Sequence, residues 1–200
     1  MYVALEGIDT SGKTTQIAAL KRHFPNAIYT KEPGGTELGA RLREILLQHH
    51  IAKTTELFLF LADRAEHYAR VVAPNADSLL ISDRSLVSGI AYALGFDAEI
   101  LCTLNRLAMP KMPDLVIVLE LDSASLQQRL SAKHRNAQAD LLESRGIAYL
   151  LDVQRNMRRA CELLGLRYLT FCATENKEIL TQRIVEAIGA KGVCESVCRD

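Results

Sequence analysis

The length, composition and charge of the chain indicate one α/β domain and argue against two classes of partner. Its 200 residues, 48% of them hydrophobic, can bury a sizeable core without a second unit. Lysine plus arginine equals aspartate plus glutamate, at 24 each, so no global positive field is expected to gather nucleic acid or an anionic membrane.

The cysteines and the first residues favour a cytoplasmic protein. The five cysteines are an odd number without a paired framework, which suits a reducing cytosol. Cys194 and Cys198 lie in a short tail, where a frayed terminus is expected rather than a metal site. A strand is expected from residue 2, which leaves no room for a signal peptide, and no apolar run approaches the roughly 20 residues of a membrane span.

Residues 7–14, with the sequence GIDTSGKT, match the phosphate-binding pattern G-x-x-x-x-G-K-[ST] and are called the phosphate loop here. A short apolar strand is predicted before them and a helix after them, as this pattern requires. Backbone N–H groups can then surround a β-phosphate, Lys13 can reach the β- and γ-phosphates, and the Thr14 hydroxyl can ligate Mg²⁺. A chance glycine-rich turn is the alternative. The residues predicted to bind the triphosphate are Gly7, Asp9, Thr10, Ser11, Gly12, Lys13, Thr14 and Thr15.

The segment Lys31-Glu32-Pro33-Gly34-Gly35-Thr36 follows a short predicted strand, residues 27–30. Open α/β sheets bind ligands at the carboxyl ends of their strands, so this loop is a candidate binding segment. A plain turn is the alternative. Thr36 can cap the next helix, whose predicted apolar stripe is Leu38, Leu42, Ile45 and Leu46.

A long helix is predicted over residues 56–72, with Thr54 or Thr55 as its cap. Its expected core residues are Leu57, Phe58, Phe60, Leu61 and Ala65. Phe60 and Arg64 stand four residues apart on one face, where the ring could stack on a planar base while the guanidinium bonds its edge. A core phenylalanine beside a surface arginine is the alternative, and the one that the pattern alone favours.

An apolar strand over residues 79–83 ends in Asp83, the pattern that places a carboxylate beside the Mg²⁺ of a phosphate-loop enzyme. The helix expected after it brings Arg84, Ser88 and Tyr92 onto one face by their four-residue spacing. The alternative is that Asp83 only caps that helix.

The rest of the chain continues to alternate helices and strands. A helix is predicted over residues 98–109, with Ile100, Leu101, Leu104 and Leu107 as its apolar side. Another helix is predicted to begin at Ser123 or Ser125, and two more are predicted over residues 139–164 and 179–188. Strands are predicted over residues 115–119 and 168–171. Near-continuous apolar strands between helices indicate a five-stranded parallel sheet covered on both faces.

A basic cluster lies where the helix from Ser123 or Ser125 is expected to end. Arg129 and Lys133 stand four residues apart, and His134-Arg135-Asn136 then interrupts the pattern. One interpretation is a mobile lid that delivers positive charge to a transferring phosphoryl group. The other is a solvated helix end, since basic residues near a break are common on surfaces.

Taken together, these motifs resemble those of the thymidylate kinase family over nearly the whole chain. Residues 3–15 resemble its opening strand and phosphate loop, residues 31–36 resemble its R-E-P-G-G-T loop, and Asp83-Arg84 resembles its D-R motif. Phe60 and Arg64 lie between the second and third of these motifs, and residues 113–115 lie after the third. The resemblance implies a P-loop NTPase fold in a single kinase domain, residues 1–200, with a small lid around 129–143 and usually a homodimer. It also implies Mg²⁺-dependent phosphorylation of dTMP to dTDP by ATP, on the way to dTTP for DNA synthesis.

The resemblance implies roles for individual residues. Asp9 would approach the sugar 3′-hydroxyl and help to order Mg²⁺. Phe60 would stack on thymine and Arg64 would contact its edge. Arg84 would bridge the dTMP phosphate and the γ-phosphate, and Tyr92 would lie under the deoxyribose. The implied substrate-binding set is Asp9, Glu32, Pro33, Phe60, Arg64, Arg84, Ser88 and Tyr92, and the implied metal ligands are Thr14, Asp83 and Asp9.

One family type carries a catalytic arginine in the phosphate loop and another supplies basic residues from the lid. Thr10-Ser11 contains no arginine, so the chain resembles the second type. The catalytic set is therefore Lys13, Arg84, Asp9 and the lid residues Arg129, Lys133 and Arg135.

Three departures from the family pattern are present. Lys31 replaces an arginine, Ala93 stands where glutamine would follow Tyr92, and residues 140–143 lack the arginine of D-R-x-E.

Two other functions share the phosphate loop. A kinase of another nucleoside or nucleotide would need a different base pocket. A nucleotide-dependent switch or regulatory ATPase would transfer nothing to a small acceptor. The N-K-x-D segment typical of GTPases is replaced by residues 120–123, Glu-Leu-Asp-Ser, which argues against a GTPase switch.

Overall fold

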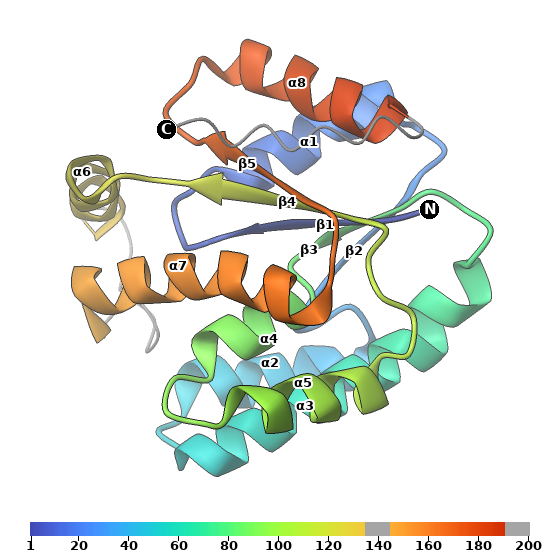
Figure 1. Cartoon of the computed structure of the whole chain (residues 1–200), viewed down its shortest axis with the longest axis vertical. Helices are drawn as coiled ribbons and strands as arrows, with labels where there is room; N and C mark the ends of the chain where they lie inside the picture. The colour runs from blue at the N-terminus through green and yellow to red at the C-terminus, as the bar shows by residue number, and fades with distance from the viewer. Residues whose placement is uncertain (135–144, 191–200) are drawn as a thin grey trace.

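The computed structural model describes residues 1–134 and 145–190, and within them five strands form one sheet in the order β2-β3-β1-β4-β5 (Figure 1). Every neighbouring pair is parallel, with Ala4 of β1 beside Ser82 of β3 and Val116 of β4. The strands are β1 Tyr2–Gly7, β2 Ile28–Lys31, β3 Leu80–Asp83, β4 Leu115–Glu120 and β5 Tyr168–Cys172. The predicted five-stranded parallel sheet is confirmed.

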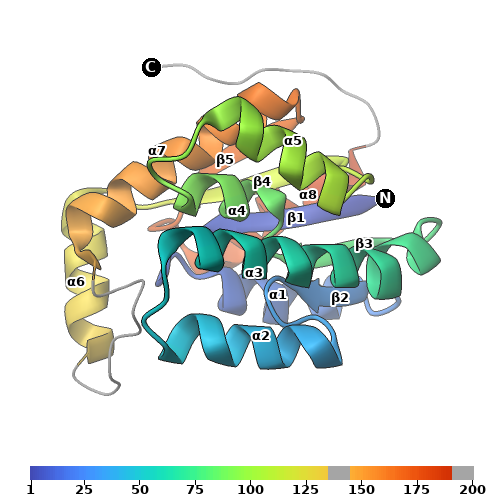
Figure 2. The same ribbon diagram turned by 90° about the horizontal axis from the view of Figure 1, so that it is seen from below.

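Helices cover both faces of the sheet. On one side lie α1 (Lys13–His23) and α8 (Lys177–Gly189); on the other lie α4 (Leu86–Tyr92) and α7 (Ile147–Leu164) (Figure 1). Beyond α4, the helices α2 (Glu37–Gln48), α3 (Lys53–His67) and α5 (Ala98–Ala108) run side by side (Figure 2). Because helices bury both faces, β1 is buried along its whole length and β4 along all but its last residue.

The carboxyl ends of the parallel strands meet at one edge of the sheet. The phosphate loop follows β1, the segment from Glu32 follows β2 and Arg84 follows β3. Helix α6 (Ser123–His134) follows β4 and begins at one of the two predicted serines, with Asp122 accepting a hydrogen bond from the Ser125 amide. This edge therefore gathers the segments that carry the predicted site.

Helix α3 differs from its prediction at both ends. It begins at Lys53 after Ala52, so neither predicted threonine is its cap, and it ends at His67. A π-helix, Tyr68–Val72, and a 3₁₀ turn, Ala73–Asn75, continue the chain. Pro74 has no N–H for the carbonyl of residue 70, so a regular α-helix cannot run through this point.

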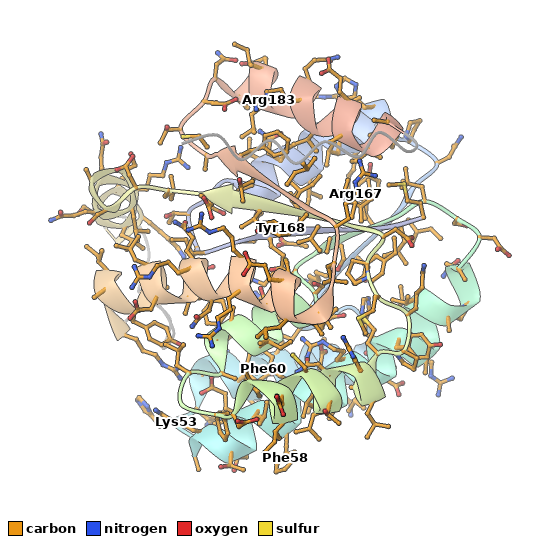
Figure 3. The ribbon with its side chains drawn as sticks, viewed as in Figure 1. Lys53, Phe58, Phe60, Arg167, Tyr168 and Arg183 are labelled. Atoms are coloured by element: carbon orange, nitrogen blue, oxygen red, sulfur yellow. The ribbon has the colours of Figure 1, made fainter. Side chains whose placement is uncertain are left out.

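The predicted apolar stripes are partly wrong. Phe58 is 57% exposed at the outer edge of the molecule (Figure 3) and Ala65 is also exposed. The predicted Leu57 and Leu61 are buried, and the other buried residues of α3 are the polar Asp63, Arg64 and His67. Outward-facing apolar residues of α2, α3 and α5 are Leu38, Ile45, Phe58, Ile100 and Leu107.

The other predicted elements agree within a few residues where the structure describes them. Helix α7 starts at Ile147, whereas residues 139–144 of its predicted range lie outside the described residues. Cys194 and Cys198 lie outside them as well. Across residues 1–134 and 145–190, no helix combines the length and the apolar character that a membrane crossing needs.

Candidate active site

The phosphate loop makes a tight turn from β1 into α1. Gly12 caps α1 with φ 94°, a left-handed conformation that favours glycine. Gly7 has φ 151°, and a Cβ atom there would lie 2.5 Å from the Ser11 hydroxyl and 2.8 Å from the Leu119 carbonyl oxygen. Both glycines of the motif are therefore required by the backbone path.

Lys13 is folded back onto the loop that it follows. Its buried ammonium group donates to the carbonyl oxygens of Gly7 at 2.9 Å and Ile8 at 3.2 Å. Burial, reinforced by the nearby positive charge of Arg84, lowers the pKa of Lys13 to about 8. Two neutral acceptors hold a cation that anionic phosphate oxygens would hold better.

Arg84 lies at the end of β3 and not on the following helix. Its φ of 70° is left-handed, and α4 begins at Leu86 with Ser85 as its cap, so the predicted shared helix face is wrong for Arg84. The Ser82 hydroxyl donates a hydrogen bond to the Arg84 carbonyl oxygen, and the Arg84 backbone N–H donates to the Leu5 carbonyl oxygen. These two hydrogen bonds fix the backbone at Arg84.

The Arg84 side chain nevertheless meets the two residues predicted beside it. Its Nη1 donates to Ser88 Oγ at 3.0 Å and its guanidinium carbon lies 5.2 Å from the centre of the Tyr92 ring. Its Nη2 forms an ion pair with Asp9 Oδ1 at 2.9 Å. The charges of Arg84 and Lys13 outweigh burial and lower the pKa of Asp9.

Glu6 is a functional candidate that the sequence reasoning missed. It is fully buried at the end of β1 and accepts hydrogen bonds from Ser85 Oγ at 2.7 Å and Ser88 Oγ at 2.5 Å. Burial raises the pKa of Glu6, and the two serine hydroxyls oppose that effect. Since Ser88 gives its only hydroxyl proton to Glu6, its oxygen lone pairs remain for Arg84.

A buried polar cluster surrounds Arg64, which is 2% exposed, so the expected surface arginine is wrong. Its Nε donates to Glu32 Oε2 at 2.9 Å and its Nη1 to Asn105 Oδ1 at 2.5 Å. The other oxygen of Glu32 lies 2.8 Å from Nδ1 of the buried His67. Glu32 thus turns inward and holds Arg64; no local periodicity could have linked it to His67 and Asn105.

Two cavities together hold most of the predicted site residues. The first, called the aromatic cavity, is lined by Asp9, Glu32, Pro33, Arg43, Leu47, Phe60, Arg64, Arg84, Ser85, Ser88, Gly89 and Tyr92. The second, called the loop cavity, is lined by Asp9, Thr10, Gly12, Lys13, Thr14, Thr15, Lys31, Glu32, Arg43, Asp83, Arg84 and Lys133. They share Asp9, Glu32, Arg43 and Arg84, so they meet at the Arg84 side chain.

The predicted site residues therefore fall into three groups. All eight predicted substrate residues line the aromatic cavity, and most of the phosphate loop lines the loop cavity. Gly7 and Ser11 line neither and shape the loop from behind. Arg43, which donates to the Pro33 carbonyl oxygen at 3.2 Å, was missed because α2 gave no motif.

The lid residues differ in position. Arg129 of α6 donates to the carbonyl oxygens of Thr10 at 2.9 Å and Ala173 at 2.8 Å, which ties the phosphate loop to the segment after β5. Lys133 lines the loop cavity. Arg135 and residues 140–143 lie outside the described residues, as does most of the predicted lid.

Comparison with known proteins identifies the family. A family model described as Thymidylate kinase matches residues 5–184. The chain belongs to the thymidylate kinase family. A relative named Thymidylate kinase from Wolinella succinogenes is 51% identical over 194 residues, which cover 96% of this chain and 100% of the relative. Another from Helicobacter hepaticus is 45% identical over 195 residues, covering 94% and 98%.

A solved structure of thymidylate kinase from Ehrlichia chaffeensis supports the fold. It superposes with a TM-score of 0.73 at 24% identity, covering 94% of this chain and 98% of that one. The P-loop NTPase fold is thus confirmed, and membership in a kinase family sets aside the regulatory ATPase.

The residues at the junction of β1, β3 and α1 fit the Mg²⁺ that serves this family together with ATP. Asp9, Thr14 and Asp83 all line the loop cavity. Asp83 Oδ1 is buried and has no hydrogen-bond partner among the described residues, which leaves an anionic oxygen to be satisfied by a ligand. Mg²⁺ in phosphate-transfer sites takes one or two carboxylates and completes its shell with phosphate oxygens and water.

Proposed function

We propose that the chain transfers the γ-phosphoryl group of ATP to dTMP, with dTMP in the aromatic cavity and the triphosphate in the loop cavity. Family membership supports the overall reaction, the formation of dTDP. The observation that carries the placement is that the two cavities meet at Arg84, between a phosphate loop and an aromatic pocket.

At the base end of the aromatic cavity, Phe60 supplies a ring for stacking and Arg64 supplies N–H groups for the base edge. Tyr92 lies toward the other end, against Arg84, and is placed to pack under the deoxyribose. A ring in that position leaves no room for a 2′-hydroxyl. This pocket suits a pyrimidine deoxyribonucleotide.

At the phosphate end, catalysis is positioning and neutralisation of charge. Arg84 exchanges its Asp9 partner for the acceptor phosphate and the γ-phosphate, and Asp9 is then free to approach the 3′-hydroxyl. Lys13 leaves the carbonyls of Gly7 and Ile8 for the β- and γ-phosphates. Thr14, Asp83 and Asp9 would hold Mg²⁺, which would neutralise phosphate charge when bound.

For the lid around 129–143 of this single kinase domain, the contacts support two different roles. Lys133 lines the loop cavity, which supports its proposed contact with the transferring phosphoryl group. Arg129 instead holds the phosphate loop through two carbonyl oxygens. Arg135 remains a further proposed source of charge.

The outward-facing apolar residues of α2, α3 and α5 support a homodimer formed through these helices, in a cytoplasmic enzyme that supplies dTDP for DNA synthesis. Leu107 is 78% exposed and Phe58 is 57% exposed in the single chain, and contact with a second copy would cover them. Equilibrium sedimentation decides the oligomeric state.

A coupled assay with ATP and a panel of nucleoside monophosphates tests the proposed function. We expect dTMP to be the best acceptor, dUMP to be weaker by the contacts of one methyl group, about 1–3 kcal/mol, and purine monophosphates to be poor. Efficient turnover of AMP or GMP with dTMP inert would refute the assignment of the aromatic cavity.

A further inference from the structure

Asn105 lies behind the aromatic cavity without lining it. It is 0% exposed on α5, its Oδ1 accepts a hydrogen bond from Arg64 Nη1 at 2.5 Å, and its Nδ2 donates to the Leu101 carbonyl oxygen at 2.8 Å. The donation to Leu101, one helical turn earlier, fixes which atom of the amide faces Arg64. Asn105 is therefore an oriented acceptor for one guanidinium N–H.

The remaining hydrogen bonds of Arg64 leave a defined number of donors for a ligand. A guanidinium has five N–H groups. Glu32 takes the one on Nε, Asn105 takes one on Nη1 and the Ser85 carbonyl oxygen takes one on Nη2 at 3.3 Å. Among the described residues, one N–H on each terminal nitrogen is left over, and Arg64 lines the aromatic cavity.

Gly89 fixes the guanidinium from the side of α4. A Cβ atom at this position would lie 2.6 Å from Nη1 and 2.7 Å from Nη2 of Arg64. The edge formed by the two terminal nitrogens thus faces the backbone of α4 at close range, and Glu32 and Asn105 are buried acceptors of the same guanidinium. Its orientation is set by residues that do not themselves need to touch a base.

The orientation matters because arginine donates hydrogen bonds and accepts none. A base with a carbonyl oxygen at the edge facing Arg64 can accept a hydrogen bond from the guanidinium. A base with an amino group there sets one hydrogen-bond donor against another, so no hydrogen bond forms. We propose that Asn105 is a positioning residue that sets the preference for a 4-keto over a 4-amino pyrimidine by holding Arg64. This inference rests on the proposed contact between Arg64 and the base.

The test compares the ratio of kcat/KM for dTMP to that for dCMP in three variants. Asn105→Leu keeps the volume but removes the acceptor, so the ratio is expected to fall about tenfold, mainly through the KM for dTMP. Asn105→Asp keeps an acceptor oxygen for Arg64 and should retain most of the ratio. Arg64→Gln is the reference for complete loss of the contact.

The outcomes separate the inference from the function on which it rests. An unchanged ratio in Arg64→Gln would refute the base contact itself. A lowered ratio in Arg64→Gln with an unchanged ratio in Asn105→Leu would overturn the role of Asn105 alone, even if Asn105→Leu melts at a lower temperature. Should Asn105→Leu not fold, Asn105→Ala is measured in the same assay, with the same expectation and the same refuting result.

Discussion

At the scale of single residues, the charged groups of the site are held in place by buried polar partners. Arg84 is oriented through Ser88, and Ser88 is oriented by Glu6. The left-handed backbone at Arg84, with φ 70°, is a conformation that costs energy for a non-glycine residue and persists where the surroundings fix it. Glu6 therefore belongs to the phosphate end of the site although it lies inside the core.

Glu6→Gln tests this chain of contacts. The amide nitrogen can donate to Ser88, which then competes with Arg84 for the serine oxygen, so we expect kcat to fall about tenfold. The thermal midpoint should change little or rise, since the substitution removes a buried charge. Steady-state kinetics and thermal denaturation measure the two effects.

Ser88→Ala is the matched variant for Glu6→Gln. It removes the link to Arg84, so its loss of kcat should be similar and the double variant should be little worse than either single one. Additive losses would show that Glu6 and Ser88 act separately, and a wild-type kcat in Glu6→Gln would contradict the proposed role of Glu6.

At the scale of elements, Arg129 and Lys133 of helix α6 differ in their surroundings. Lys133 lines the loop cavity, whereas Arg129 bonds the Thr10 and Ala173 backbones. Lys133→Met is expected to lower kcat more than dTMP affinity, because its charge is needed mainly as phosphoryl transfer proceeds. Arg129→Met is expected to raise the KM for ATP by loosening the phosphate loop.

Lys21→Met provides a control for Lys133→Met. Lys21 lies in the last turn of α1, where its ammonium group is 5.4 Å from the centre of the Tyr29 ring, and it lines neither cavity. The Lys21→Met substitution should leave kcat and KM unchanged. If Lys133→Met behaves like this control in steady-state and binding assays, Lys133 belongs to a solvated helix end and has no catalytic role.

The elements also show what the sequence could predict. The phosphate loop, the apolar strands and the Thr36 cap depend on residues close in the chain, so local patterns indicate them correctly; Thr36 Oγ1 accepts from the Gly39 amide at 2.9 Å. The apolar pattern could not predict that Arg64 and His67 of α3 are buried, because their hydrogen-bond partner Glu32 lies more than 30 residues away in the sequence. Such partners are visible only after folding.

At the scale of the whole molecule, the parallel sheet brings the ends of β1, β2 and β3 together and so assembles the site from distant segments. The family motifs predicted most of the residues that line the two cavities, whereas Glu6, Arg43, His67 and Asn105 carry no motif and were missed. The positions of Arg43, His67 and Asn105 follow from the packing of α2, α3 and α5 beyond α4 (Figure 2), whereas Glu6 lies on the central strand β1.

The central claim is that two substrates occupy two cavities that meet at Arg84. A crystal structure with dTMP and a non-hydrolysable ATP analogue tests it most directly. We expect the thymine ring on Phe60 with its edge at Arg64, the triphosphate on the phosphate loop with Lys13 against it, and the Arg84 guanidinium between the two phosphate groups. A thymine outside the aromatic cavity, or an Arg84 that stays paired with Asp9 and contacts neither phosphate, would contradict the account.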